Sequence, residues 1–295
     1  MTESIKCPTI SIGMPVYNGE KNLPRILNSL SEQTYKDIEL IISDNASTDA
    51  TEKICREYAS RDNRIRYIRQ PENLGAVANF QYVLNEALGE YFMWAAADDI
   101  HSPDFLELNH SFLELHPDYV ASTCPVKFEG QKFNSVRMGD ASLTEGLADR
   151  VEKYLHSWHA NGRFYSLMRT SLLRPCPYIG EDFFGSDWAV VLYVITQGKT
   201  YRHPNGCVEL GRQGFSNSGK IFEHYRKSWI HWILPFYELN GVVSKISKSF
   251  PIPHKIKILK HMIVLNRLAL SALIKNESRR KLKGIYLYFF RRQSQ

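Results

Sequence analysis

The chain has 295 residues, of which 43% are hydrophobic and 12% aromatic, enough to build a sizeable core in one large or two small domains. Its five cysteines include no CxxC pair, which argues against a disulfide framework and favours reduced thiols in a cytoplasmic protein. No apolar run approaches the roughly 20 residues that cross a bilayer, and the amino terminus lacks a signal-peptide pattern. We therefore expect a protein that neither spans a membrane nor is secreted.

Charge is unevenly distributed along the chain. The formal net charge is +6, but the residues from Ser244 onward contain 13 Lys and Arg and a single acid, Glu277. This last segment therefore carries a net charge of +12, and the preceding residues carry −6. The basic character belongs to a C-terminal tail rather than to the body of the protein.

The first hundred residues alternate between strand and helix patterns. Strands are predicted over residues 9–14, 38–43, 64–69 and 90–94, and amphipathic helices over residues 22–33, 51–60 and 75–88. Strand starts separated by one βα unit predict an α/β fold with a mostly parallel sheet flanked by helices. Ligands bind such sheets at the carboxyl ends of the strands.

The rest of the chain divides into two regions. Up to about residue 220, we predict a helix over 105–115, strands over 119–123 and 164–169, a helix over 186–197, and an irregular loop over 127–150. From residue 221 the pattern becomes helical, with an aromatic stripe from Trp229 to Tyr237 and a basic amphipathic segment over 255–275. We therefore predict a catalytic domain over 1–220 and a basic helical region over 221–295.

Two adjacent carboxylates, Asp98 and Asp99, follow the apolar stretch that ends at Trp94. Two such charges at the end of a buried strand are best explained by a divalent cation, and oxygen ligands suit Mg²⁺ or Mn²⁺. The alternative is that they open a loop and cap the next helix. No GxGxxG follows the first strand and no GxxxxGK[ST] occurs, which disfavours dinucleotide-binding enzymes and P-loop NTPases.

Three segments of the chain carry a family resemblance: SIGMPVYNGEKNLPRILNSLSEQTYKDIELIISDNASTDAT, NLGAVANF and YFMWAAADDI. In this order and spacing they resemble the family 2 nucleotide-sugar glycosyltransferases of GT-A fold, over roughly residues 9–218. The resemblance implies an inverting, metal-dependent transfer of a sugar from a nucleoside-diphosphate sugar. A UDP- or dTDP-sugar is the favoured donor.

The resemblance also implies which residues bind the nucleotide. Pro15, Tyr17 and Asn18 are expected to border it, and Asp44 to accept a hydrogen bond from the imide of uracil or thymine. Asn73 and Gly75 match the segment before the helix near the sugar nucleotide. Asp44 has an alternative role as a helix cap, and Asn73 and Gly75 as a simple turn.

The expected metal motif departs from the family pattern, because Ala96 stands where many relatives have the first carboxylate. The resemblance implies that Asp98 contacts the Mg²⁺ or Mn²⁺ ion that bridges the two phosphates, with Asp99 beside it. Arg212 lies in a glycine-containing stretch that resembles the loop closing over the phosphates. A surface turn is the alternative for this stretch.

The resemblance places the general base at the start of a helix, in the sequence Gly185-Ser186-Asp187-Trp188, where Ser186 replaces a family Glu. Asp187 is the expected catalytic base, and a single displacement from one base implies inversion at the anomeric carbon. Glu181 and Asp182 are the competing carboxylates. A structural alternative for Asp187 is stabilisation of the helix dipole.

The basic tail predicts peripheral association with the inner face of the cell membrane. Because similar family members often carry such tails, the resemblance implies a glycan or polyprenyl-linked acceptor in cell-surface polysaccharide or lipopolysaccharide synthesis. The alternatives are a helical bundle packed on the catalytic domain, and nucleic-acid binding, for which no recognised module is present. The aromatic stripe also suits a homodimer.

Two rival functions remain open at this point. A nucleotidyltransferase would share the type of sheet and the use of a metal ion, but it needs a glycine-rich, lysine-containing first loop, which is absent. A non-catalytic nucleotide-binding or scaffold protein of the same fold is compatible with Ala96 and Ser186, which both replace family carboxylates.

Overall fold

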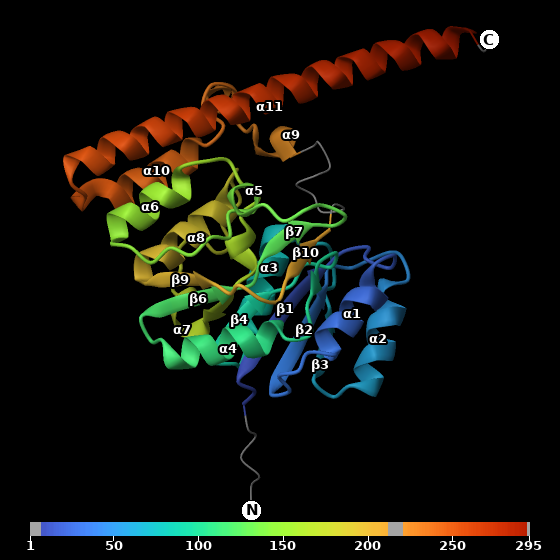
Figure 1. Ribbon diagram of the computed structural model, residues 1–295. Helices are drawn as coiled ribbons and strands as arrows, with labels where there is room; N and C mark the ends of the chain where they lie inside the picture. Colours follow the sequence, from blue (N-terminus) through green and yellow to red (C-terminus); the bar gives the residue numbers. More distant parts are fainter. Residues whose placement is uncertain (1–6, 212–220, 294–295) are drawn as a thin grey trace, which may run out of the picture.

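The computed structural model describes residues 7–211 and 221–293, and of residues 222–223 and 277–293 it describes the backbone alone. A central sheet is covered by helices on both faces, and the long C-terminal helix α11 crosses one end of the molecule (Figure 1). The strands are β1 (Ile10–Val16), β2 (Ile38–Asp44), β3 (Ile65–Arg69), β4 (Tyr91–Trp94), β5 (Ile100–His101), β6 (Tyr119–Thr123), β7 (Val126–Phe128), β8 (Leu167–Arg169), β9 (Lys199–Arg202) and β10 (Val208–Leu210).

The helices surround the sheet and then continue into a C-terminal group. They are α1 (Leu23–Ser31), α2 (Thr51–Arg61), α3 (Ala76–Asn85), α4 (Phe105–Leu115), α5 (Ser135–Met138), α6 (Leu147–Leu155), α7 (Thr170–Leu173), α8 (Ser186–Gln197), α9 (Ile221–Tyr225), α10 (Tyr237–Ile246) and α11 (Ile252–Gln293). Short 3-10 turns are η1 (Gly162–Tyr165), η3 (Trp229–Trp232) and η4 (Ser247–Ser249).

The main sheet has seven strands in the order β3-β2-β1-β4-β8-β6-β9. The first four are parallel, β8 runs antiparallel to its neighbours β4 and β6, and β9 is parallel to β6. One face is covered by α1, α2 and α4 and the other by α3, α7 and α8. The strands β1, β2 and β4 are buried along their whole length, as expected for a parallel sheet covered on both faces. The predicted α/β architecture is confirmed.

A second, three-stranded sheet lies beside the carboxyl end of β4. Its order is β5-β10-β7, with β10 antiparallel to β5 and parallel to β7. The pairing joins the segment just after Asp98 and Asp99 to the segment that ends at Gly211. Residues more than 100 positions apart are thereby brought to one edge.

Two sequence predictions differ from the structure. Residues 127–150, predicted as an irregular loop, contain parts of β7 and α6 and the whole of α5. The buried face of α6, which includes Val151, Tyr154 and Leu155, was obscured in the sequence by intervening charged residues. The predicted strand 164–169 is shorter, because residues 162–165 form a 3-10 turn and β8 begins at Leu167.

The C-terminal helices share a core with the catalytic part of the chain. Side chains from α6, α8, α10 and the first half of α11 form one buried apolar cluster. Five apolar side chains at helical spacing within the predicted amphipathic segment 255–275 are buried, namely Ile258, Met262, Leu265, Ala269 and Leu273. Within the described residues, no helix combines the length and apolar content needed to cross a membrane.

This packing predicts that α11 contributes to the stability of the whole protein. Leu265 is 0% exposed, so Leu265→Ala should lower the free energy of unfolding by about 2–5 kcal/mol. Leu259 on the same helix is 61% exposed, so Leu259→Ala should change it by less than about 0.5 kcal/mol. Chemical denaturation measures both, and equal effects of the two substitutions would contradict a packed helix.

Candidate functional site

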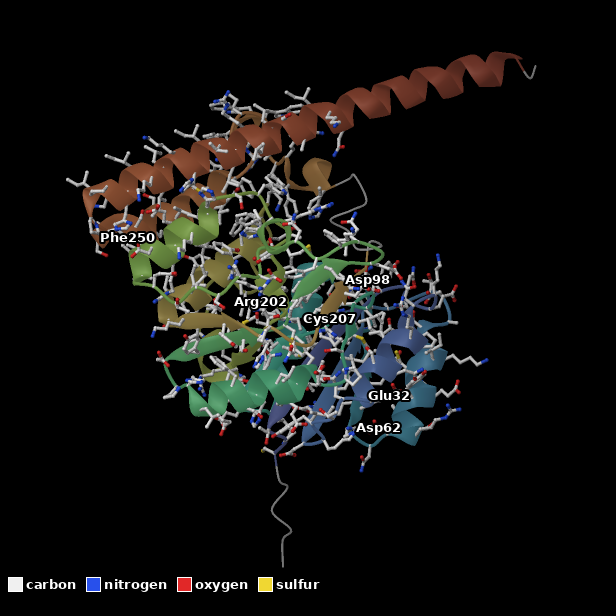
Figure 2. The ribbon with its side chains drawn as sticks, in the orientation of Figure 1. Glu32, Asp62, Asp98, Arg202, Cys207 and Phe250 are labelled. Atoms are coloured by element: carbon white, nitrogen blue, oxygen red, sulfur yellow. The ribbon has the colours of Figure 1, made fainter. Side chains whose placement is uncertain are left out.

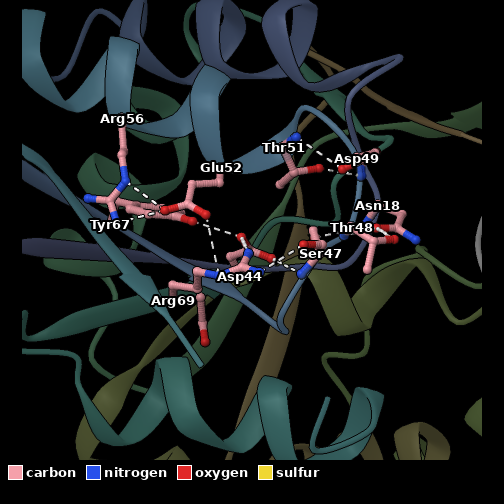
Figure 3. Close-up of polar contacts among 12 residues, drawn as sticks. Asn18, Asp44, Ser47, Thr48, Asp49, Thr51, Glu52, Arg56, Tyr67 and Arg69 are labelled. Carbon is pink, nitrogen blue, oxygen red and sulfur yellow. Dashed lines mark hydrogen bonds and ion pairs between the residues drawn. The ribbon is translucent and has the colours of Figure 1, made fainter. Parts of the chain in front are cut away.

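The loops that follow β1 and β2 are tied together at the carboxyl edge of the sheet. Pro15 lies at the end of β1, and Tyr17 directly after it is half exposed. The Asn18 amide N–H donates to the Ser47 hydroxyl at 2.9 Å, and its Oδ1 accepts from the Thr48 amide at 2.8 Å. Figure 3 shows these contacts, which fix the two loops against each other.

Asp44 ends β2 and is completely buried. Its Oδ1 accepts from the Ser47 amide at 2.8 Å, and its Oδ2 accepts from the Tyr67 hydroxyl at 2.7 Å and the Arg69 guanidinium at 2.9 Å (Figure 3). A carboxylate accepts about four hydrogen bonds, so these three donors leave room for one more, on Oδ1. The sequence did not single out Arg69, whose side chain is one third exposed at this edge.

The segment before α3 folds onto the end of β2. Asn45 donates through Nδ2 to the Asn73 side-chain oxygen at 2.9 Å and to the Gly75 carbonyl at 3.1 Å. Gly75 has φ 85°, a left-handed conformation that glycine adopts without steric cost, and it precedes the helix. Asn73 and Gly75 are therefore held at the same edge of the sheet as Asp44. Unlike the buried Asp44, both are exposed to solvent.

Asp98 and Asp99 follow β4, on the side of the sheet toward α9 and α11; Glu32 and Asp62, after α1 and α2, lie at the opposite end (Figure 2). Asp99 is 3% exposed; its Oδ1 accepts from the Gly211 amide at 3.0 Å, while its Oδ2 has no partner among the described residues. Burial raises the pKa of Asp99 well above its usual range, and the charge of Asp98 raises it further.

This pair of carboxylates fits a divalent cation. A buried carboxylate oxygen without a partner is destabilising, and a cation would compensate its charge together with that of Asp98. Gly211 closes against Asp98 so tightly that a Cβ at this position would overlap the Asp98 carbonyl and carboxylate. The glycine thus leaves room for the Asp98 carboxylate. Metal binding by Asp98 and Asp99 stays a prediction.

Asp187 lies in the first turn of α8 and reaches solvent, although protein atoms surround it closely. Desolvation raises the pKa of its carboxyl, and this is opposed by the Asn161 amide, which donates through Nδ2 to Oδ2 at 2.9 Å. Of the competing carboxylates, Glu181 is exposed, as Asp187 is, whereas Asp182 forms ion pairs with His224 and Lys227 near α9.

One tyrosine connects the metal and base candidates. Burial raises the pKa of the Tyr165 phenol well above its usual range, and the charges of Asp99, Asp98 and Asp187 raise it further. All three carboxylates are therefore within electrostatic range of one phenol, which stays protonated at neutral pH. Residues separated by almost 90 positions are brought together around Tyr165, which sequence reasoning had missed.

Arg212 lies outside the described residues. Its neighbour Gly211 is described, and its contacts with Asp98 and Asp99 bring this segment to the carboxylates. No sequence signal pointed to a role for Tyr165 or Asn161, since Tyr165 falls within the predicted strand 164–169 and Asn161 just before it. Arg69 carried a weak signal, as a basic residue at the carboxyl end of a predicted strand.

Comparisons with known proteins agree with this architecture. Residues 11–174 match the family model described as Glycosyl transferase family 2. "Putative glycosyltransferase EpsE" of Bacillus subtilis is 37% identical over 151 residues, which are 50% of this chain and 54% of that protein. "Glycosyltransferase GlyA" of Streptococcus pneumoniae serotype 4 is 41% identical over 98 residues, 33% of this chain and 14% of that protein. The chain thus spans about half the length of the first relative and much less of the second.

Solved structures share the fold at low identity. TarS 1-349 of S. aureus, in complex with UDP-GlcNAc, has a TM-score of 0.65 at 18% identity, covering 86% of this chain and 71% of that chain. The mannosyltransferase PcManGT from Pyrobaculum calidifontis, in complex with GDP-Man and Mn²⁺, has a TM-score of 0.57 at 18% identity, covering 97% of this chain and 84% of that chain. These neighbours establish the GT-A-like fold.

The unpartnered oxygen of Asp99 gives a prediction for stability without metal. Because burial raises the pKa of Asp99, ionisation of this carboxyl destabilises the folded protein. The loss of stability begins as the pH rises above about 4, the pKa of an aspartate in the unfolded chain. It is complete once the pH exceeds the pKa of Asp99 in the folded protein. In EDTA at pH 7.5, Asp99→Asn should therefore raise the free energy of unfolding by about 1–3 kcal/mol. Mn²⁺ should raise the Tm of the parent protein but not that of Asp99→Asn.

Asp62→Asn is the matched control for this experiment. Asp62 pairs with Arg64 at 2.6 Å at the opposite end of the sheet, so its loss should destabilise the protein and preserve the response to Mn²⁺. If Asp99→Asn lowers the free energy of unfolding in EDTA, as Asp62→Asn should, then Asp99 does not carry an uncompensated charge in the folded protein.

Proposed function

Because the chain belongs to glycosyl transferase family 2, we propose that it is an inverting, metal-dependent enzyme that transfers a sugar from a UDP- or dTDP-sugar to a hydroxyl group. The observation that carries this proposal is that the charges of Asp98, Asp99 and Asp187 all act on the Tyr165 phenol. Sugar transfer requires charge stabilisation at the departing diphosphate and removal of a proton from the acceptor. Asp98 and Asp99 suit the first task, and Asp187 suits the second.

On the donor side, Asp98 and Asp99 would hold Mg²⁺ or Mn²⁺. The bound ion supplies positive charge that stabilises the departing diphosphate. The unpartnered Asp99 oxygen supports this role, and the Mn²⁺ complex of the PcManGT neighbour is consistent with it. The Gly211 amide holds the Asp99 carboxylate through a hydrogen bond to Oδ1.

On the acceptor side, Asp187 would act as general base. The acceptor O–H proton moves to the Asp187 carboxylate, the acceptor oxygen bonds to the anomeric carbon, and the bond from that carbon to the diphosphate breaks with its electrons on the phosphate. A base whose pKa is raised by burial accepts a proton more readily, provided that it remains ionised at the working pH. Attack opposite to the leaving group inverts the anomeric centre.

Asp44 would select the base of the nucleotide. Three donors already fix its orientation, and its remaining acceptor capacity on Oδ1 suits the single imide N–H of uracil or thymine. Tyr17, Asn18, Asn73 and Gly75 would border the nucleotide at the same edge. The UDP complex of the TarS neighbour supports a sugar donor whose nucleotide carries uracil.

Asp187→Asn is the substitution that tests the proposal. Without the base, release of UDP from UDP-GlcNAc should fall by about 10²–10⁴-fold, while affinity for the nucleotide is retained. Calorimetric titration with UDP, dTDP and GDP, each with Mn²⁺ and with EDTA, measures binding and identifies the preferred base. Binding should depend on Mn²⁺ and weaken in Asp98→Ala and Asp44→Ala.

Asp182→Asn is the control, since Asp182 is the competing carboxylate on the segment before α8 and is engaged with His224 and Lys227. It should keep both binding and turnover. Turnover lost in Asp182→Asn and kept in Asp187→Asn would reject Asp187 as base. Absence of binding to all three nucleotides would move the function toward a non-catalytic member of the family.

We also propose that the enzyme works on a glycan or polyprenyl-linked acceptor at the inner face of the cell membrane, in cell-surface polysaccharide synthesis. The support is the outer side of α11, where Ile252, Ile256, Leu259 and Ile263 are exposed at helical spacing. Lys255, Lys260 and Arg267 are exposed beside them. Apolar side chains flanked by basic ones suit the surface of an anionic bilayer.

This surface gives a prediction for vesicle binding. Each basic residue adds about 1 kcal/mol of attraction near an anionic membrane, so Lys255→Glu with Lys260→Glu should weaken sedimentation with phosphatidylglycerol vesicles at least tenfold. Lys21→Glu with Lys53→Glu, the same charge change on exposed residues near α1 and α2, should leave it unchanged. Equal binding to neutral phosphatidylcholine vesicles, or a dimer by light scattering that buries this side of α11, would contradict the proposal.

A further inference from the structure

The Asp187 carboxylate is held by a side chain that comes from another part of the chain. Asn161 follows α6 and is 1% exposed, and its amide Nδ2 donates to Asp187 Oδ2 at 2.9 Å. We infer that Asn161 is a positioning residue for the catalytic base, which orients the Asp187 carboxylate so that Oδ1 faces the acceptor hydroxyl. This inference rests on the proposed role of Asp187.

A second hydrogen bond fixes the direction of the Asn161 amide. The Tyr154 hydroxyl donates to Asn161 Oδ1 at 2.7 Å, and its pKa is raised well above the usual range, first by burial and then by the charge of Asp187. Tyr154 therefore remains a donor. Since its hydroxyl occupies the oxygen of the amide, the Asn161 NH₂ group must face Asp187, where an ionised carboxylate can only accept.

The Asn161 backbone is anchored as well. Its φ of 54° is left-handed, a conformation that asparagine tolerates better than most residues. Its amide donates to His159 Nδ1 at 3.1 Å, and the His159 ring stacks on Trp188 of α8 with the centroids 4.1 Å apart. The same turn of α8 that carries Asp187 therefore also holds the segment that carries Asn161.

The hydrogen bond from Asn161 makes the two oxygens of the Asp187 carboxylate different. Oδ2 is occupied by the amide, whereas Oδ1 accepts from no side chain in the described part of the chain. A hydrogen bond to the ionised form favours that form, so Asn161 opposes the desolvation that would otherwise protonate the base. The backbone amides of Trp188 and Asp187 also donate to this carboxylate, so Asn161 supplies the largest of several hydrogen bonds that favour its ionised form.

Burial holds several titratable groups around Asp187 in one charge state between about pH 5 and pH 9. It raises the pKa of Tyr154, Tyr165 and Tyr225, lowers that of His159 to about 3, and lowers that of Arg163 to about 10. Asp182, His224 and Lys227 form an ion-pair group next to Tyr225, and Asp98 and Asp99 act on the Tyr165 phenol together with Asp187. Because burial raises the pKa of Asp99 as well, the assignment of a shifted acid limb to Asp187 needs a titration of the Asp187 carboxyl itself.

Three substitutions test the inference. Asn161→Gly removes the amide while accepting the left-handed backbone, Asn161→Asp keeps the shape but replaces the donor by a carboxyl, and Tyr154→Phe releases the far end of the amide. The acid limb of the pH profile of kcat/KM should move upward by about 1 pH unit in Asn161→Gly, more in Asn161→Asp, and less in Tyr154→Phe. UDP release from UDP-GlcNAc gives this profile, and KM for the donor should stay unchanged.

A second readout does not depend on turnover. In protein labelled with ¹³C at the aspartate carboxyls, the resonance missing in Asp187→Asn belongs to Asp187, and its titration gives the pKa directly. The control is Asn109→Ala in α4, another buried asparagine with three side-chain hydrogen bonds, which should lower the Tm without moving the Asp187 pKa.

The outcomes separate the two proposals. An unchanged Asp187 pKa and pH profile in Asn161→Gly and Asn161→Asp would overturn the role of Asn161, even if Asp187→Asn is inactive. The Asp187 pKa could instead shift in the Asn161 variants while Asp187→Asn keeps full turnover. That result would overturn Asp187 as the base, and Asn161 would then have no role in catalysis through Asp187. A shift in both readouts, with Asp187→Asn inactive, supports the assignment.

Discussion

The parallel pairing of β1 with β2 and β4 is the constraint on which the rest of the structure depends. These strands have apolar centres that are buried on both faces, and they pair with neighbours on both edges. Polar side chains lie toward the strand ends, as do the buried Ser11 and Glu39, which are hydrogen-bonded to each other near the amino ends of β1 and β2. Asp44 ends β2, and Asp98 and Asp99 follow β4, so the paired register brings these three carboxylates to one edge.

This constraint explains how much the sequence could predict. Strands β1, β2 and β4 are mostly apolar, and α1 and α11 repeat apolar residues at helical spacing, so local pattern alone located them. Tyr165 lies in a predicted strand and Asn161 just before it, but their importance comes from interactions with Asp187 and the two metal candidates, which are distant in sequence. Such long-range contacts leave no local signal. The start of α6 was not predicted for a different reason, because charged residues stand between its apolar residues in the sequence.

The two positions at which the chain departs from the family pattern have related electrostatic consequences. A carboxylate in place of Ala96 would add a third negative charge near Asp98 and Asp99, where one buried oxygen already lacks a partner. A carboxylate in place of Ser186 would sit beside Asp187 and raise its pKa further by like-charge repulsion. With serine there, the ionised state of Asp187 is balanced chiefly between desolvation and the Asn161 amide. The base site therefore depends on a residue outside the motif.

The C-terminal helices also take part in placing the base. Asn266 of α11 accepts a hydrogen bond from the Phe236 amide at 3.0 Å, and the Phe236 ring packs against Trp188 and against Gly185, which has no side chain to keep it away. Trp188 in turn stacks on His159, the residue that anchors Asn161. A continuous set of contacts thus leads from α11 to the Asp187 carboxylate. If α11 rests on a membrane, the bilayer surface and the catalytic base are held in a fixed relation by this packing, which is the geometry needed to act on an acceptor that is itself anchored in the membrane.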